Sequence, residues 1–166
     1  MKKLFTLMAF VLAFVSTTAV FQSCSNDDDE TPATTAAAKE VAGTYIGDGK
    51  MTVMGSSFDY PSVSYVLEVK DDNTVNLTIP ATGEGNMKFP DLKVEGIGVT
   101  KASDGTYKLA DVEYKGSVAV DGNTKNYTVT LEGSTVNGST LRLNYSLQYG
   151  SMPMAMVTTF EGTKSK

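Results

Sequence analysis

The sequence predicts an all-β fold, and we expect an antiparallel up-and-down β-barrel of about eight strands. Several windows alternate apolar and polar residues with period two, as strands with one buried face do. Turn-forming runs such as Asp71-Asp72-Asn73, Asp121-Gly122-Asn123 and Asn137-Gly138 separate these windows. Because the spacers are short, neighbouring strands should pair as antiparallel hairpins. Frequent tyrosine, threonine and glycine agree with β-structure that has many turns.

Residues 1–23 have the pattern of a secretion signal. Met1-Lys2-Lys3 is basic, and the apolar run from Leu4 to Val15 is short for a membrane span, which disfavours the alternative of an uncleaved anchor. The end of this segment, Val20 to Cys24, resembles the lipoprotein box of bacteria. We therefore expect cleavage before Cys24 and fatty acyl chains such as palmitate on it. Cys24 is the only cysteine, so the rival interpretation is a free thiol or an intermolecular disulfide.

Residues 24–40 form the expected tether between the lipid and the domain at 41–166. The acidic run Asp27 to Glu30 can be read simply as solvated linker. Such a run behind the lipidated cysteine also resembles the surface-export signal of Bacteroidetes lipoproteins. We therefore expect the protein to be anchored by its lipid to the outer membrane, on the cell surface rather than on the periplasmic face. A helical turn over 36–40 is possible, with no expected role.

Within the domain, the alternation predicts individual strands in order. Val63 to Val69 and Val75 to Ile79 come first, and Tyr127 to Leu131 follows the central glycine-containing runs. The clearest alternation runs from Leu141 to Tyr149, and a last strand is expected from Met154 to Glu161. Glycines inside these runs, at 47, 49, 96 and 98, are expected at bulges or bends. A closed barrel removes exposed edges, whereas a two-sheet sandwich remains the alternative.

Composition limits the classes of function. The chain has no histidine, which removes the commonest general base and metal ligand. Without Lys2 and Lys3 of the leader, 12 basic residues face 19 acidic ones, a net charge of −7. Such a protein is a poor partner for nucleic acid, because nothing offsets repulsion by the phosphates. The sequence does not fix an oligomeric state.

The segment Gly43-Thr44-Tyr45-Ile46-Gly47 resembles the start of the calycin-like β-barrel domain of Bacteroidetes lipoproteins. Two further segments, 94–99 and Phe160-Glu161-Gly162, share the resemblance, which spans about 41–163. The first of these segments, at Gly43-Thr44-Tyr45, is also similar to the Gly-x-Trp start of lipocalins, with Tyr45 in the place of tryptophan. The resemblance implies a closed antiparallel barrel of about eight strands and no established activity.

A barrel of about eight strands holds either core side chains or one small ligand. Inward tyrosines place hydroxyls on an apolar wall, a mixture that can orient an apolar or amphipathic molecule. The alternative is that the same side chains only fill the core. The residues predicted to contact a ligand are Tyr45, Tyr65, Leu67, Leu143, Tyr145, Met156 and Phe160.

No residue is predicted to be catalytic or to bind a metal, and no cofactor is expected. Met152, Met154 and Met156 would share one face of a strand and could bind a soft metal, although core packing is the simpler interpretation. Most acidic residues lie in turns, so the two facing carboxylates of a glycosidase are not indicated. A second hypothesis is an interaction protein that binds a glycan or protein partner. It rests on the loop aromatics Phe58 and Phe89 and on Tyr60.

Overall fold

The computed structural model describes residues 36–83 and 88–166. The signal segment, Cys24 and the acidic run lie outside these residues, so what the sequence predicts for them remains a prediction. The described chain is all-β apart from one short helix, which confirms the predicted fold class. The elements are α1 (Ala37–Val41), β1 (Gly43–Val53), β2 (Ser56–Asp71), β3 (Thr74–Ile79), β4 (Leu92–Lys101), β5 (Tyr107–Leu109), β6 (Val112–Val120), β7 (Asn123–Leu131), β8 (Thr135–Asn137), β9 (Thr140–Tyr149) and β10 (Met156–Lys164).

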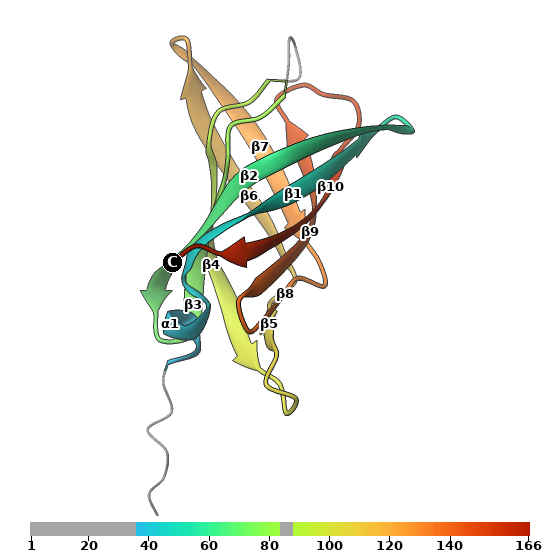
Figure 1. Cartoon of the computed structure of the whole chain (residues 1–166). Helices are drawn as coiled ribbons and strands as arrows, with labels where there is room; N and C mark the ends of the chain where they lie inside the picture. Colours follow the sequence, from blue (N-terminus) through green and yellow to red (C-terminus); the bar gives the residue numbers. More distant parts are fainter. Residues whose placement is uncertain (1–35, 84–87) are drawn as a thin grey trace, which may run out of the picture. The chain divides into compact units, whose positions relative to one another are not determined.

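Eight of the strands close into a ring in the order β10-β1-β2-β3-β4-β5-β8-β9 (Figure 1). Pairing of β9 with β10, from Met156 opposite Leu147 to Thr163 opposite Thr140, completes the ring. Neighbouring strands are antiparallel throughout. The closed ring confirms the predicted barrel and disfavours the sandwich alternative, because a ring has no second sheet to pack against.

The β6–β7 hairpin branches from the ring, and this is where the strand order departs from a simple up-and-down meander. β8 covers only the part of β9 from Thr140 to Arg142. The rest of that edge is free for β7, which pairs from Tyr127 opposite Tyr149 to Leu131 opposite Tyr145. A ten-residue strand beside a three-residue strand therefore leaves an edge that a second hairpin fills.

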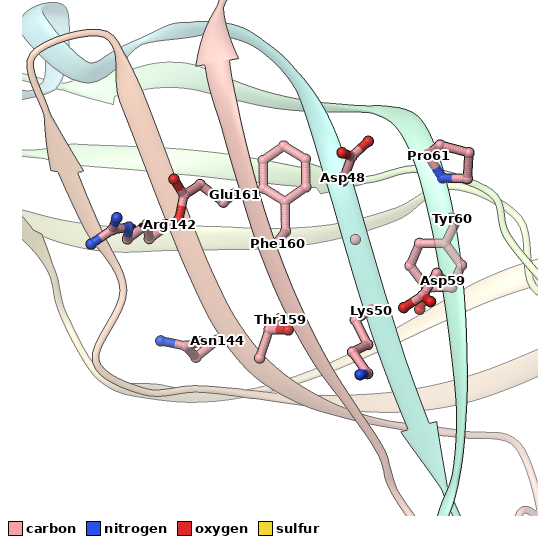
Figure 2. Close-up of a pocket in the computed structure, with 11 residues that line it drawn as sticks. Asp48, Lys50, Asp59, Tyr60, Pro61, Arg142, Asn144, Thr159, Phe160 and Glu161 are labelled. Atoms are coloured by element: carbon pink, nitrogen blue, oxygen red, sulfur yellow. Dashed lines mark hydrogen bonds and ion pairs between the residues drawn. The ribbon is translucent and has the colours of Figure 1, made fainter.

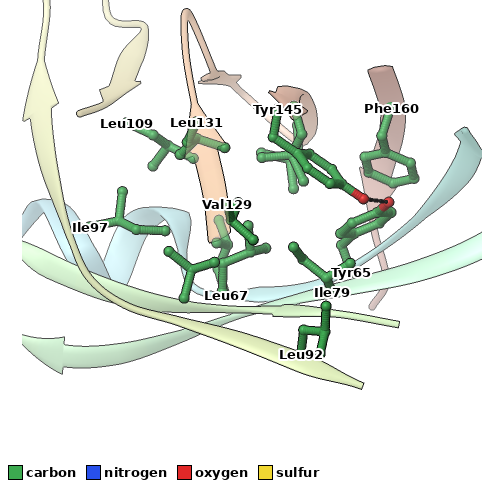
Figure 3. Packing of buried hydrophobic residues seen from close by; sticks show 14 of the residues in the cluster. Tyr65, Leu67, Ile79, Leu92, Ile97, Leu109, Val129, Leu131, Tyr145 and Phe160 are labelled. Carbon is green, nitrogen blue, oxygen red and sulfur yellow. Dashed lines mark hydrogen bonds between the residues drawn. The ribbon is translucent and has the colours of Figure 1, made fainter. Parts of the chain in front are cut away.

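The inward residues of the ring form one apolar core (Figure 3). Burial alternates along β9 and β10 with period two, as the sequence predicts. The last strand begins at Met156, so the expected start at Met154 is wrong; Met154 lies in the preceding loop with half of its surface exposed. The loop at 150–155 contains Gly150 and Pro153, which interrupt the alternation.

The helix α1 closes one end of the barrel, which we name the closed end. Ala38 and Val41 are completely buried, and the Ala38 amide donates to the Asp72 carbonyl at the β2–β3 turn. The Tyr45 hydroxyl donates to the Val41 carbonyl at 2.7 Å. Residues 36–40 thus belong to the folded unit rather than to the tether, because the barrel end needs apolar cover that Ala38 and Val41 supply.

The opposite end, which we name the open end, carries the β1–β2 and β6–β7 hairpins (Figure 1). The loop between β3 and β4 also lies at this end, and an isolated bridge pairs Thr82 with Phe89 in it. The Phe89 side chain is buried against Tyr149 of β9, with ring centroids 6.0 Å apart. The expectation that Phe89 is an exposed loop aromatic is therefore wrong, because its phenyl group covers apolar surface of its own barrel.

Glycines on β1 and β10 make space for aromatic rings inside the barrel. A Cβ at Gly49 would lie 2.7 Å from the ring of Tyr60, and one at Gly162 would collide with the ring of Phe160. The register between β1 and β2 shifts between Gly47 and Gly49, as expected of a bulge. Ser62, on the partner strand, has a φ of 59° there. The glycine positions therefore set both the bend of the strands and the positions of the rings.

Candidate functional site

All seven residues predicted to contact a ligand are buried inside the barrel, on β1, β2, β9 and β10. Their packing brings three of them into direct contact. The rings of Tyr65 and Phe160 have centroids 4.3 Å apart, and the hydroxyls of Tyr65 and Tyr145 form a hydrogen bond of 2.8 Å (Figure 3). Tyr45 differs, because its hydroxyl is used at the closed end. The seven residues are Tyr45, Tyr65, Leu67, Leu143, Tyr145, Met156 and Phe160.

Four inward side chains bring hydroxyl groups together, and we name Tyr60, Tyr65, Tyr145 and Thr158 the hydroxyl cluster. Thr158 of β10 is completely buried and lies directly opposite Tyr145 of β9. Tyr60 and Tyr65 come from β2, on either side of the bulge. The cluster thus joins β2 to β9 and β10, which are distant from β2 in the sequence but near it in the ring.

Two oxygen atoms of the hydroxyl cluster are buried without a hydrogen-bond partner among the described residues: Tyr60 Oη and Thr158 Oγ1. Burial raises the pKa of Tyr60 and Tyr145, and the nearby Thr158 hydroxyl acts in the opposite direction on both, although neither contact meets the distance and angle of a hydrogen bond. Leaving a buried polar group unpaired costs about 1–3 kcal/mol, so such groups are rare in folded proteins.

The hydroxyl cluster is uncharged at neutral pH. Burial raises the pKa of Tyr65 to about 12, an effect that the hydrogen bond from Tyr145 partly offsets. Burial also raises the pKa of Tyr60, and it holds the pKa of Tyr145 well above its usual range. Among the described residues, the buried polar or charged side chains other than tyrosine are Ser134 and Thr158, so no ionic side chain is buried there. The cluster can donate and accept hydrogen bonds but offers no charge.

The sequence analysis did not predict that the hydroxyls of Thr158 and Tyr60 lie in the barrel interior. For Thr158, the sequence does contain a signal. Thr158 lies between Met156 and Phe160 with period two, and this spacing places it on their face. Tyr60 could not be placed in this way, because the bulge at Pro61 and Ser62 interrupts the alternation of β2. Its hydroxyl, assigned to a loop surface from the sequence, lies in the interior instead.

An apolar rim lies between the hydroxyl cluster and the open end. Met51 is paired with both Thr158 and Phe58, and only 5% of its surface is exposed. Met156 lies two residues nearer the open end than Thr158 and is buried. Phe58 is 46% exposed at this rim. Methionine side chains adapt their shape easily, so this end can adjust more readily than the closed end.

The outer face of the same strands has a groove of about 540 Å³, whose lining shares Tyr60 and Phe160 with the interior site (Figure 2). It crosses β2, β1, β10 and β9, and its charged side chains have both signs. Arg142 is already paired with Glu161 at 2.9 Å, and both are largely exposed. Its lining residues are Asp48, Gly49, Lys50, Asp59, Tyr60, Pro61, Arg142, Asn144, Thr159, Phe160 and Glu161.

Within residues 36–83 and 88–166, no three side chains of the metal-binding acidic, histidine or cysteine types gather around one point. None of the helices in that part of the chain combines the length and the apolar character of a membrane-spanning segment.

The structure defines a small antiparallel β-barrel with an apolar interior and a buried group of hydroxyls. The family model of the calycin-like beta-barrel domain matches residues 41–163. The chain therefore belongs to the calycin-like β-barrel domain family, as the resemblance of its glycine-aromatic segments predicted.

Comparison with solved structures gives a crystal structure from Bacteroides fragilis of a protein named "putative outer membrane protein". It is 22% identical to this chain, with a TM-score of 0.60, and the match covers 78% of this chain. The match spans 53% of that protein, so this chain corresponds to about half of its length. At this identity the similarity shows the fold alone. No curated protein matches the chain.

Proposed function

We propose that this protein is a lipid-anchored binding protein of the outer membrane, and that the open half of its barrel holds a small apolar or amphipathic molecule. The observation that carries the proposal is the pair of unpartnered hydroxyls, Tyr60 Oη and Thr158 Oγ1, in an otherwise apolar interior. A fold gains nothing from burying them unpaired. A ligand with a polar group would supply the missing partner.

The rim of the open end supports the same proposal. A molecule entering there would first contact Met51, Phe58 and Met156, and then reach the hydroxyl cluster. Apolar walls with a few placed polar groups are the usual composition of a small-molecule site. Among the described residues, the closed end has no unpartnered buried hydroxyl, because the hydroxyl of Tyr45 is bonded to the Val41 carbonyl.

The binding proposal is tested by NMR of protein labelled with ¹³C at its methionine methyl groups. On titration with the apolar probe N-phenyl-1-naphthylamine, we expect saturable binding with shifts of the Met51 and Met156 methyls. Exposed Met54 serves as the internal control, because it lies at the hairpin tip with 74% of its surface accessible. Absence of saturable binding, or shifts confined to Met54, would contradict the proposal.

The anchor is a separate part of the proposal and rests on the lipoprotein box that ends at Cys24. Several acyl chains would hold the protein on a membrane, whereas one chain binds only reversibly. Cells grown with a clickable palmitate analogue should label the natural protein and not the Cys24→Ser variant. Protease treatment of intact cells should then degrade the labelled protein if it is on the cell surface. An unlabelled natural protein would contradict the anchor.

A second candidate function is binding of a glycan or a protein partner on the outside of the barrel. The observation that favours it is the outer groove, with Lys50, Asp59 and Asn144 presented together on one concave surface (Figure 2). Asp59→Ala and Asn144→Ala should abolish a glycan-array signal if this groove binds sugars. An unchanged signal in both variants would exclude the groove as the site.

A further inference from the structure

We propose that the hydroxyl cluster selects ligands whose polar group is an uncharged oxygen acceptor, such as an alcohol, ester or amide, and rejects carboxylates and phosphates. This inference rests on the proposed function and deepens it by naming the chemical class of the ligand. It follows from a count of the hydrogen-bond donors in the cluster and from the absence of a buried cation among the described residues.

The donor count begins with the four hydroxyls, each of which has one hydrogen to donate. Tyr65 and Tyr145 share one hydrogen bond, which uses a single hydrogen. The hydrogen of the other member of this pair remains free, as do those of Tyr60 and Thr158. Three donors of the cluster are therefore unused. A carbonyl oxygen accepts two of them through its two lone pairs, and an alcohol oxygen does the same while donating its own hydrogen.

A charged group is disfavoured because the described part of the barrel holds no buried charge of opposite sign. The nearest strands carry their cations on the outer face, where Lys50 is exposed and Arg142 is paired with Glu161. Burying an anion without an ionic partner costs far more free energy than burying a neutral polar group. The raised pKa of Tyr65 and Tyr145 reports the same property, since this interior also resists formation of a phenolate.

The groups around the site also predict how binding depends on pH. The titratable groups that face the cluster are its own tyrosines, from β2 and β9. β1 contributes Gly49 and Met51, and β10 contributes Thr158 and Phe160, none of which titrates. Because the pKa of each cluster tyrosine is raised above 10, binding of a neutral ligand should not change between about pH 5 and 9.

The test compares three ligands that share a ten-carbon chain: decanol, methyl decanoate and decanoic acid, each below its aggregation limit. Near pH 8 we expect the alcohol and the ester to bind about tenfold or more tightly than the acid, which is then a carboxylate. The affinity for the acid should rise as the pH falls towards 5, because its neutral form becomes more abundant. The affinity for the alcohol should stay constant.

Matched variants assign this selectivity to the hydroxyl cluster. Thr158→Val, which keeps the shape of the side chain, should weaken decanol binding by roughly three- to tenfold and N-phenyl-1-naphthylamine binding by a smaller factor, because that probe has no oxygen acceptor. Tyr60→Phe should act in the same direction. Thr159→Val is the control, because Thr159 is the next residue on β10 and faces outward; it should change neither affinity.

The outcomes separate this inference from the proposed function. Decanoate binding near pH 8 as tightly as decanol, or Thr158→Val behaving like Thr159→Val, would overturn the inference while leaving a binding barrel. If neither the three ligands nor the apolar probe bind, the proposed function itself fails.

Discussion

The two ends of the barrel treat the same kind of side chain in different ways. At the closed end, the Tyr45 hydroxyl is buried and bonded to the Val41 carbonyl. At the open end, the Tyr60 hydroxyl is buried with no partner in the described chain. Helix α1 supplies the acceptor at the closed end, whereas no described backbone group bonds to Tyr60 Oη or Thr158 Oγ1. The fold thus satisfies the buried Tyr45 hydroxyl at the closed end and leaves two hydroxyls unpaired towards the open end, where we place the ligand.

The largest expected effect on both ends is alkaline unfolding. Burial raises the pKa of Tyr45 and of Tyr65 to about 12, from 10 in the unfolded chain. Their contribution to stability is therefore complete below pH 10 and is lost as the pH rises from 10 through 12. Absorbance of ionised tyrosine near 295 nm and far-ultraviolet circular dichroism should change together in that window. Ionisation of all tyrosines near pH 10 with the fold intact would contradict the burial of these hydroxyls.

The next largest effect should come from filling the space that a glycine leaves for Phe160. Gly162→Ala places a methyl group against the Phe160 ring and 2.9 Å from the backbone of Ile46. We expect a loss of about 1–3 kcal/mol in the free energy of unfolding, measured with urea. Gly98→Ala is the control, since its added methyl meets only the Ala110 Cβ at 3.5 Å. Equal losses in both variants would show that the close approach at Gly162 does not matter.

The smallest effect gives the sharpest contrast between the ends. Tyr45→Phe removes a made hydrogen bond and leaves the Val41 carbonyl without it, which should cost about 1–2 kcal/mol of unfolding free energy. Tyr60→Phe removes an unpartnered hydroxyl, so it should be neutral or stabilise the protein by up to about 1 kcal/mol. Urea unfolding of the two variants under one condition measures the difference. Equal destabilisation by both would remove the contrast.

Most of the fold could be predicted from the sequence because burial alternates along strands such as β9. The turn residues gave the antiparallel pairing, and the need to protect edges gave closure. The β6–β7 branch could not be predicted, since it depends on β8 being too short to cover the edge of β9. The role of α1 was also missed, because a five-residue helix has too few residues for a periodic pattern.

The candidate site was predicted only in part. Period two gave Tyr65, Tyr145 and Phe160 as inward residues, and the structure brings these three together. The two cluster residues with unpaired hydroxyls, Thr158 and Tyr60, were not predicted. Thr158 was missed because it is a small polar residue within an apolar pattern. Tyr60 follows a bulge that no alternation can cross. Whether a hydroxyl finds a hydrogen-bond partner depends on three strands at once, and this information is not local in the sequence.

The most direct test of the central claim is thermal unfolding of the natural protein and of Thr158→Val, each with and without saturating decanol. If the open end keeps its hydroxyls for a ligand, the variant should be at least as stable as the natural protein without the alcohol. It should also gain less stability from the alcohol, because stabilisation by a ligand grows with the logarithm of the ligand concentration divided by the dissociation constant. A variant that unfolds at lower temperature without the alcohol, or that gains the same stabilisation from it, would contradict the account.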